Sequence, residues 1–387
     1  MEIADIRRLT PALDNCVYFQ TSGFSPKPEP VIEEVVRCMR FQNQGPALSW
    51  VHQEMEKTFE SVRARVAAAL GASSPDEIML NENTSVGINV VANGIHWRAG
   101  DNVVLSDHEH PGNRLVWYQI ARHFGVELRF TPLCNDYARL LERFEALLDG
   151  RTRVVSISHV SRESGLRLPA RQLVEVAHRH GVPVLFDGAQ SFGSIPVNVR
   201  ELGCDFYTCS GHKYIMGPQG TGAFYVRRDM LEWLKPSWIG SHSQESFGPA
   251  GEFELKASAR RFEFGTRNLA DQAGFGKALE IWESIGWDNV YARIAAYTDF
   301  LKALLLAEVP GLWLETPLPY SFSSGIVTFG LPGFESGAVC ASLMQKERVL
   351  VAPADERAVR ISTHVFNTEE EAGRLVAGLK RILKSGL

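Results

Sequence analysis

The sequence predicts an α/β protein with a large domain, built on a mostly parallel sheet flanked by helices, and a smaller α+β C-terminal domain. From about residue 66 to residue 226, short β-branched runs alternate with longer helical patterns, which is typical of βαβ units. The predicted strands are almost continuously apolar, as expected where helices cover both faces of a sheet. Farther along, longer helical patterns dominate, and only two more strands are expected.

The large domain is expected to contain one long loop, several helices and five strands. Residues 236–256 are rich in Gly, Ser and Pro and have weak periodicity, so a long loop is expected there. The predicted helices include Val86–Asn93, Leu115–Phe124 and Ala170–Arg179. The predicted strands are Glu77–Leu80, Asn102–Ser106, Arg153–Ser158, Val182–Phe186 and Phe206–Cys209.

The C-terminal region begins with a helical pattern over residues 269–308. Two strands are then expected, at Ser323–Phe329 and Ala358–Ser362. The run from Thr368 to Glu371 fits a capping box before a final amphipathic helix. We therefore predict a large domain over residues 16–265 and a small domain over residues 266–387, which also includes residues 1–15.

Composition excludes several classes of protein. The 387 residues include 40 Lys and Arg against 45 Asp and Glu, a net charge of −5, so neither nucleic acid nor an anionic membrane is an expected partner. The six cysteines are scattered without a C-x-x-C pair, which favours reduced thiols in the cytoplasm. The first residues carry acids and lack the apolar segment of a signal peptide. A soluble cytoplasmic protein is expected.

Two side chains at strand ends carry the strongest chemical signal. Asp187 follows a buried strand, where a parallel sheet places its ligands, although a turn or helix-capping aspartate would look the same. Lys213 lies between a strand and the glycine-rich turn 217–222, where burial would lower its pKa and make it a nucleophile, although most lysines are surface charges. Together, the acid and the lysine suit pyridoxal phosphate, which needs a lysine to bind covalently and an acid that protonates its pyridine nitrogen.

Other segments could complete such a site. Residues Asn83, Thr84 and Ser85 lie where a strand gives way to a helix, so that backbone N–H groups and hydroxyls can converge on a phosphate; a plain helix cap remains the alternative. Ser210 and His212 could add donors, and His110 could stack on the cofactor ring. No metal site is expected, because the His-x-His pairs at 108–110 and 178–180 lack a third ligand.

Five segments, in register from about residue 15 to the C-terminus, resemble the class V aminotransferase family of fold type I pyridoxal-phosphate enzymes. They are DGAQS, SGHK with GPQGTG, ENTS, EHPGN and FEFGTRN. Within the family, the chain is most similar to cysteine desulfurases, cystine C–S lyases and isopenicillin N epimerase-like proteins. The resemblance implies a fold type I architecture and a homodimer with composite active sites that acts on a small amino acid.

The resemblance also implies roles for individual residues. Lys213 would bind the cofactor and move the substrate's Cα proton, with Asp187 on the pyridine nitrogen and His110 on the ring. Arg360 would bind the substrate's α-carboxylate, unless it forms a structural ion pair, and its planar fork suits that anion. Asn113 and Arg162 are further candidates for substrate contact. The remaining cofactor contacts would be Gln190 on the phenolic oxygen, Thr84, Ser85, Ser210 and His212 on the phosphate, and Thr266 on the phosphate of the neighbouring subunit's cofactor.

The sequence departs from the desulfurase pattern in three places. Residues 349–357, where desulfurases carry a mobile catalytic cysteine, contain none, and Cys340 is expected on a helix. Arg162 replaces an asparagine; it could bind a second substrate carboxylate or pair with Glu163. The pattern GTRN, in which Arg267 follows Thr266, resembles the epimerase-like branch more than the desulfurases, and Arg267 could contact substrate or phosphate. The sequence thus favours a C–S lyase that acts on cysteine, cystine or an S-conjugate. An epimerase or aminotransferase is the first alternative, and a catalytically silent regulator of the same fold is the second.

Overall fold

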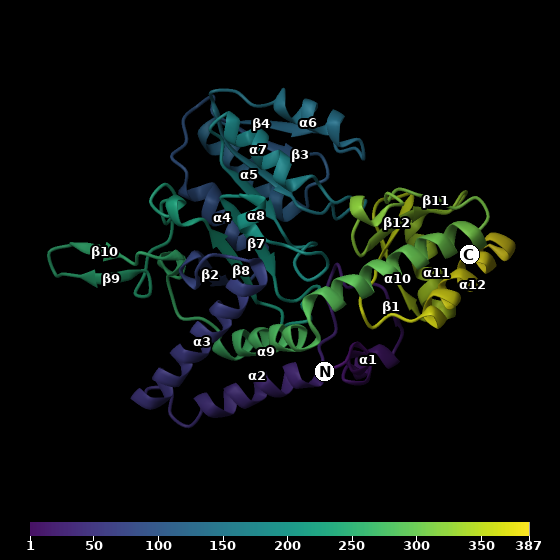
Figure 1. Cartoon of the computed structure of the whole chain (residues 1–387), viewed down its shortest axis with the longest axis horizontal. Helices are drawn as coiled ribbons and strands as arrows, with labels where there is room; N and C mark the ends of the chain where they lie inside the picture. The colour runs from purple at the N-terminus through teal and green to yellow at the C-terminus, as the bar shows by residue number, and fades with distance from the viewer. Residues whose placement is uncertain (387) are drawn as a thin grey trace.

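A seven-stranded sheet forms the centre of the larger part of the molecule (Figure 1), and the computed structural model describes residues 1–386. The strand order is β2-β8-β7-β6-β5-β3-β4. Strand β8 runs antiparallel to both of its neighbours, and the other pairs are parallel, so the mostly parallel sheet is confirmed. The strands are β2 (Ile78–Asn81), β3 (Asn102–Ser106), β4 (Glu127–Thr131), β5 (Thr152–Ser158), β6 (Val184–Asp187), β7 (Phe206–Ser210) and β8 (Gly222–Val226).

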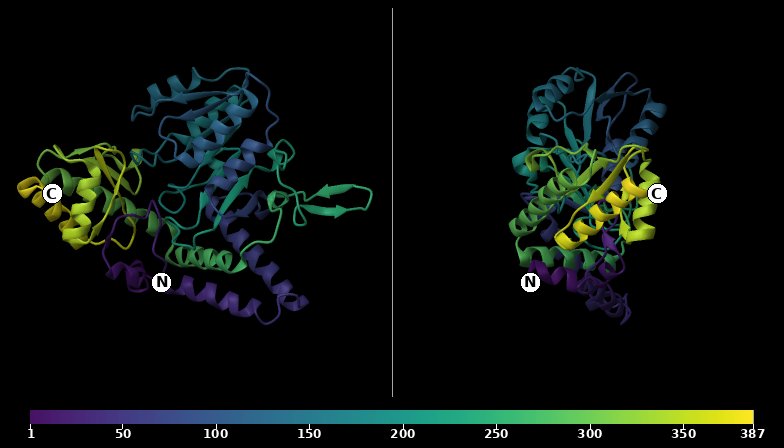
Figure 2. Two further views of the ribbon diagram at one scale, coloured as in Figure 1. Left: turned by 180° about the vertical axis from the view of Figure 1, so that it is seen from behind. Right: turned by 90° about the vertical axis from the view of Figure 1, so that its right-hand side faces the viewer.

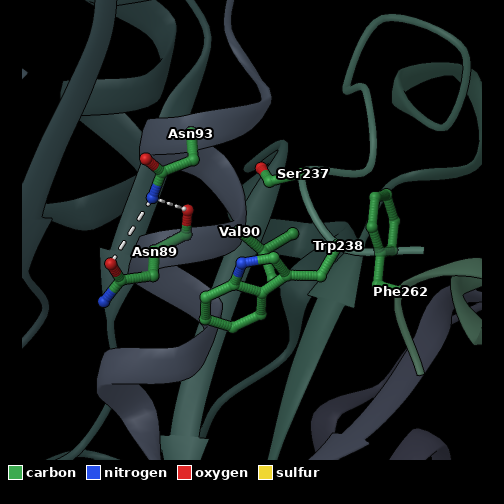
Figure 3. Close-up of a pocket in the computed structure, with 6 residues that line it drawn as sticks. All are labelled: Asn89, Val90, Asn93, Ser237, Trp238 and Phe262. Carbon is green, nitrogen blue, oxygen red and sulfur yellow. Dashed lines mark hydrogen bonds between the residues drawn. The ribbon is translucent and has the colours of Figure 1, made fainter. Parts of the chain in front are cut away.

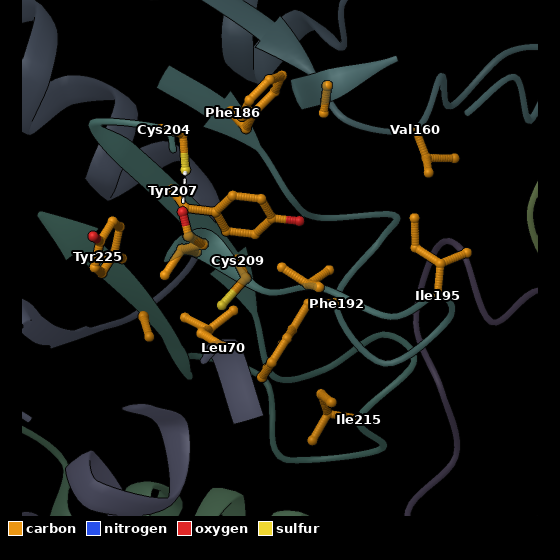
Figure 4. Packing of buried hydrophobic residues seen from close by; sticks show 14 of the residues in the cluster. Leu70, Val160, Phe186, Phe192, Ile195, Cys204, Tyr207, Cys209, Ile215 and Tyr225 are labelled. Carbon is orange, nitrogen blue, oxygen red and sulfur yellow. Dashed lines mark hydrogen bonds between the residues drawn. The ribbon is translucent and has the colours of Figure 1, made fainter. Parts of the chain in front are cut away.

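Helices cover both faces of this sheet, which explains its continuously apolar strands. Helices α4 (Thr84–Gly94) and α5 (Pro111–Phe124) pack on one face. The other face is covered by α3 (Ser49–Leu70), α6 (Tyr137–Glu145), α7 (Ala170–Arg179) and α9 (Leu269–Ile285). Figure 4 shows part of the second core, a cluster that includes Phe186 and Tyr207 from neighbouring strands and Phe192 and Ile215 from the loops that follow. These loops lead into the functional region.

The smaller part is built on a four-stranded antiparallel sheet in the order β11-β12-β15-β14. Its strands are β11 (Trp313–Leu314), β12 (Ile326–Gly330), β14 (Ala352–Pro353) and β15 (Ala358–Ser362). Helices α10 (Trp287–Glu308), α11 (Ser336–Glu347) and α12 (Glu369–Ser385) pack around the core of this part. The capping box of α12 is confirmed, because the backbone N–H groups of Thr368 and Glu371 each donate to the other residue's side chain, at 3.1 and 3.3 Å.

The N-terminal segment connects the two parts. After α1 (Ile3–Arg8), strand β1 (Val17–Tyr18) pairs in parallel with β13 (Val349–Leu350), and its core contacts lie in the smaller part. Helix α2 (Glu29–Gln42) then packs against α9 beside the large sheet. Helix α9 itself contributes to the core of the large sheet. The division predicted from the sequence, 16–265 and 266–387 with 1–15, stays a prediction.

Several segments differ from the sequence expectations. The structure adds strands β4 and β8 to the large sheet, and in the C-terminal region, where only two strands were expected, it adds β11, β13 and β14. Residues 236–256, expected as a loop, contain an antiparallel hairpin of β9 (Gln244–Phe247) and β10 (Phe253–Leu255) that projects from the body of the molecule (Figure 2). The helical pattern over residues 269–308 is divided at Gly286, whose φ of 90° ends α9 and lets α10 start in a new direction. In the described part of the chain, no helix is both long and apolar enough to cross a membrane.

Candidate active site

A cavity of about 280 Å³ opens at the carboxyl ends of the large sheet's central strands, where it also meets the smaller part. Ten of the twelve residues predicted for the site line it, and the exceptions are Asn113 and Thr266. The lining residues are Ser22, Gly23, Phe24, Asn83, Thr84, Ser85, His110, Ser158, Arg162, Asp187, Ala189, Gln190, Ser210, His212, Lys213 and Arg360. The fold therefore brings together residues that are up to 338 positions apart, from Ser22 to Arg360.

Asp187 is the last residue of β6, and Lys213 lies three residues beyond the end of the neighbouring strand β7, so the parallel pairing brings both to the same edge of the sheet. Burial lowers the pKa of Lys213 to about 8; Asp187 opposes this shift, and Arg360 and Arg162 add to it. Burial raises the pKa of Asp187, against the effects of Lys213 and of the Ala189 N–H, which donates to its Oδ1 at 2.9 Å. A lysine with this pKa is partly neutral near pH 8, as a nucleophile for an aldehyde must be.

The first turn of α4 forms an anion seat at one end of the cavity. Asn83 caps the helix, and its side chain accepts the N–H of Val86 at 3.3 Å. The backbone N–H of Thr84 donates to Ser210 Oγ at 3.2 Å, and the two hydroxyls lie 2.6 Å apart. Hydroxyls and helix N–H groups thus converge at this end of the cavity, which is the arrangement that binds phosphate.

Several polar atoms of the cavity-lining residues are buried without a hydrogen-bond partner. They include Gln190 Oε1, His212 Nδ1 and Arg360 Nε. Such atoms are unusual in a folded protein, because burial of an unsatisfied polar group is unfavourable. They fit a ligand with both donor and acceptor groups, and together with Lys213, Asp187 and the anion seat they match the chemistry of pyridoxal phosphate.

His110 caps α5, and its Nδ1 accepts the N–H of Gly112 at 2.9 Å. Burial, together with the positive charges of Lys213, Arg162 and Arg360, lowers the pKa of His110 to about 4. The imidazole is therefore neutral at pH 7, with its proton on Nε2. A neutral ring at the cavity wall is suited to packing on an aromatic ligand.

Asn113, expected to contact substrate, lies in the same helix but outside the cavity. Its Nδ2 donates to Glu109 Oε2 at 2.7 Å, and its Oδ1 accepts from Trp117 at 3.0 Å and from Ser156 at 2.7 Å. With its amide engaged in this way, a substrate contact has no support from the geometry. These three hydrogen bonds hold the Asn113 side chain away from the cavity, although it follows His110 by only about one helical turn.

Glu109 is a buried acid that sequence reasoning missed. It is 1% exposed, and it accepts hydrogen bonds from Ser106, Asn113 and both the N–H and the hydroxyl of Ser158. Burial raises its pKa, against these hydrogen bonds. Since Ser158 lines the cavity, Glu109 holds that part of the wall in place. The sequence signal was an acid three residues beyond the end of β3.

Residues 22–24 were also missed. They follow β1, and the N–H of Ser22 donates to Ser362 Oγ at 2.9 Å. The carbonyl of Ser22 accepts from Gln190 Nε2 at 3.1 Å, and Phe24 packs against His212 with the rings tilted by 32° and their centroids 5.3 Å apart. No local pattern could reveal this, because the segment reaches the cavity only through contacts with distant parts of the chain.

Arg360 enters the cavity from β15 of the small sheet, and Arg162 enters from the turn after β5. Arg360 donates one hydrogen bond from Nη1 to the carbonyl of Arg162 at 3.3 Å. Burial, together with the positive charge of Arg162, lowers the pKa of Arg360 to about 10. Among residues 1–386, neither arginine forms an ion pair with a carboxylate.

Thr266 and Arg267 lie outside the cavity of their own chain. Thr266 is exposed, and Arg267 pairs with Glu82 at 3.1 Å. The role predicted for Thr266 at a neighbouring subunit stays a prediction. Arg267 Nε is buried without a hydrogen-bond partner, and the contact with substrate or phosphate expected for Arg267 stays a prediction.

A second hollow lies beside α4, between Asn89, Asn93 and Trp238 (Figure 3). Its volume is about 10 Å³, which is room for about one water molecule. Asn93 Nδ2 donates to the carbonyl of Asn89 at 2.9 Å, so this amide nitrogen already has a partner within the helix. This hollow is too small for an amino-acid substrate.

The fold and the cavity define a fold type I enzyme, and a family model for class-V aminotransferases matches residues 17–375. The chain belongs to this family. It is 34% identical to a cysteine desulfurase of Enterobacter sp. (strain 638), over 94% of this chain and 93% of the relative. It is 33% identical to a cysteine desulfurase of Escherichia coli O7:K1, with the same coverage.

Two solved structures show the same architecture. One is a lysine-to-alanine variant of C-DES with glycine covalently linked to its pyridoxal-phosphate cofactor; it has 29% identity, a TM-score of 0.89, and coverage of 96% of this chain and 98% of that one. The other is a complex between the cystine C–S lyase C-DES and its product cysteine persulfide, with 29% identity, a TM-score of 0.88 and the same coverage.

Proposed function

We propose that this protein is a pyridoxal-phosphate-dependent C–S lyase that acts on cysteine, cystine or a related S-conjugate. The family, the lysine and acid at the ends of β7 and β6, and the relatives named above support this assignment. When bound, the cofactor supplies an electron sink for the electron pair left at Cα when its proton is removed.

Lys213 holds the cofactor and then carries the Cα proton of the substrate. The lowered pKa of its amine, about 8, suits both tasks near neutral pH. Asp187 keeps a proton on the pyridine nitrogen, and Arg360 binds the α-carboxylate and so orients the Cα–H bond. His110, neutral and fixed by its hydrogen bond from Gly112, packs on the cofactor ring. Thr84, Ser85, Ser210 and His212 hold the phosphate, and Gln190 contacts the phenolic oxygen.

The observation that separates lyase from desulfurase is the position of the cysteines. Among the described residues, no cysteine lines the cavity, and the loop between β13 and β15 contains none. Cys340 lies on α11, packed against the core of the smaller part, and burial raises its pKa to about 11. A protonated thiol in that position is a poor nucleophile. Sulfur therefore leaves with its carbon chain or as sulfide, without transfer to an enzyme cysteine.

For cystine, the overall reaction consumes one water and gives pyruvate, ammonia and cysteine persulfide. The Cα proton is removed, the Cβ–S bond breaks, and its electron pair leaves with the sulfur as persulfide. Water then replaces the amino group of the three-carbon product, which is released as pyruvate. The balance needs no oxidant or reductant.

The test is a product analysis of the purified holoenzyme with cysteine, cystine and S-conjugates. We expect pyruvate and ammonia in equal amounts, and the same yields from a Cys340→Ser variant. Alanine as the carbon product, together with sulfur bound to the protein and loss of both in the Cys340→Ser variant, would contradict the proposal. A 2-oxo acid that retains sulfur, or racemised substrate, would instead support the aminotransferase or the epimerase-like alternative.

We also propose a homodimer in which Thr266 reaches the phosphate of the neighbouring subunit's cofactor. The residue is exposed and lies outside its own cavity, and the nearby hairpin exposes Phe247 by 76% and Phe253 by 52%. Mixing inactive Lys213→Ala subunits with Thr266→Ala subunits should then give heterodimers with one intact site and partial activity. Additive activities after mixing would contradict shared sites. The cytoplasmic location expected from the sequence stays a prediction.

A further inference from the structure

Arg162 is a positively charged side chain of the cavity that the proposed function leaves without a partner. It is half-buried, and its carbonyl is engaged by Arg360 at 3.3 Å. Within the part of the chain that the structure describes, its guanidinium pairs with neither the adjacent Glu163 nor any other carboxylate. Its charge instead acts on other site residues, and contributes to the lowered pKa values of His110, Lys213 and Arg360.

The charges of the cavity are unbalanced. Among its lining residues, Lys213, Arg162 and Arg360 are cationic, and Asp187 is the only carboxylate. The proposed function assigns Lys213 and Asp187 to the cofactor and Arg360 to the α-carboxylate. The anion seat at α4 is built from hydroxyls and N–H groups and does not need Arg162. One fixed positive charge is left for a second anion.

Two neighbouring arginines also repel one another, and burial increases this repulsion. Such a pair is stable when each guanidinium is paired with an anion, and an arginine fork binds a carboxylate through two parallel hydrogen bonds. A substrate with two separate carboxylates can satisfy both arginines at once. A substrate with only an α-carboxylate leaves one of them unpaired.

We propose that Arg162 binds a second carboxylate, on the leaving-group side of the sulfur, so that the preferred substrate is a dianionic cysteine disulfide such as cystine. This inference rests on the proposed function and narrows its substrate class. Free cysteine and neutral S-conjugates lack the second anion and are the poorer substrates.

The first test compares two mixed disulfides of cysteine, one with 3-mercaptopropionate and one with ethanethiol. They differ only in the distal carboxylate. We expect kcat/KM to be about 10- to 100-fold higher for the carboxylate substrate, mainly through KM, as is typical of a buried charged hydrogen bond. In Arg162→Gln this ratio should fall to about one, and Arg162→Lys should restore part of it. Arg171→Gln, an exposed arginine on α7, is the control and should keep the wild-type ratio.

A second test needs no turnover. The sulfur-free amino acid 2-aminosuberate has the same chain length between its two carboxylates as cystine, and 2-aminoheptanoate lacks only the distal carboxylate. Titration of the holoenzyme, followed by the change in cofactor absorbance, should show tighter binding of 2-aminosuberate, and Arg162→Gln should remove the difference. If 2-aminosuberate bound more tightly but no sulfur amino acid released pyruvate, the lyase assignment would be wrong, and the carboxylate subsite at Arg162 would still stand.

If the wild-type enzyme released pyruvate from both mixed disulfides with equal kcat/KM, the role proposed for Arg162 would be wrong, and the lyase assignment would still stand. A ratio unchanged in Arg162→Gln, together with a shifted absorbance of the bound cofactor, would also overturn it. That result would place Arg162 on the phenolic oxygen of the cofactor.

Discussion

Two buried arginines of this protein, Arg63 and Arg360, show how a scaffold and a site treat the same charge differently. Arg63, on α3, binds both oxygens of Glu263 at 2.6 and 3.1 Å and the carbonyl of Ile78 at 2.7 Å. Burial disfavours its charge, but the effect of Glu263 prevails and the pKa of Arg63 is raised. Arg360 is also buried, at 4% exposure against 1% for Arg63, yet it has one hydrogen bond, an unpartnered Nε and a pKa lowered to about 10.

The difference teaches where to look for ligands in this fold. A buried charge without a partner destabilises the protein, so it persists where another molecule provides the partner. Glu263 completes Arg63 within the chain and also accepts the N–H of Leu80 at 2.7 Å. Nothing within the described chain does this for Arg360. Arg63 thus joins α3 to the segment before α9, while Arg360 is held ready for an anion.

The largest effect is expected from removal of Lys213. Lys213→Ala should lower pyruvate release by about 10²- to 10⁴-fold or more, because both the covalent anchor and the proton carrier are lost. The yellow absorbance of the bound cofactor, and its bleaching by borohydride, should disappear in the same variant. If both persisted, another residue would be the anchor.

Arg360→Met should lower kcat/KM for any amino-acid substrate by about 10²-fold, chiefly through KM, because the α-carboxylate loses a charge-assisted pair. Its thermal stability without substrate should stay the same or rise, since an unpaired buried charge is removed. Steady-state kinetics and thermal unfolding measure the two effects. An unchanged KM, or a clear loss of stability, would show that Arg360 is structural.

The opposite result is expected for Arg63→Met. It should destabilise the protein by about 3–5 kcal/mol, because Glu263 is left buried without its partner. The double variant Arg63→Met, Glu263→Gln should regain part of this stability, whereas KM should change little in either. Denaturant unfolding of the wild type, the single variant and the double variant measures these free energies. If Arg63→Met were as stable as the wild type, the contrast between Arg63 and Arg360 would be wrong.

The smallest effect concerns pH. The Lys213 amine is protonated below its pKa of about 8 and neutral above it, so the rate of covalent cofactor attachment to the apoprotein should rise with pH and level off above about 8. In Arg360→Met, the loss of a nearby positive charge should raise this pKa and move the curve to higher pH. A wild-type midpoint near 10.5, the ordinary value for lysine, would show that the cleft does not perturb the amine.

Much of this site could be predicted because it depends on local pattern. Strands β3 and β15 and helix α7 have the predicted bounds, and Asp187 and Lys213 were recognisable at strand ends. Asn113 could not be placed in this way, since a motif does not show that Glu109, Trp117 and Ser156 occupy its amide. Ser22 reaches the cavity through β1 and β13, strands that are more than 300 residues apart. Sequence alone could not show that Arg162 and Arg360 have no carboxylate partner among residues 1–386, because this depends on how distant segments pack.

The most direct test of the central claim is the identity of the carbon product released from cystine by the holoenzyme. A lyase whose cavity contains no cysteine should release one pyruvate and one ammonia for each cysteine persulfide formed, and no alanine. Alanine in place of pyruvate, with sulfur retained on the protein, would contradict the account.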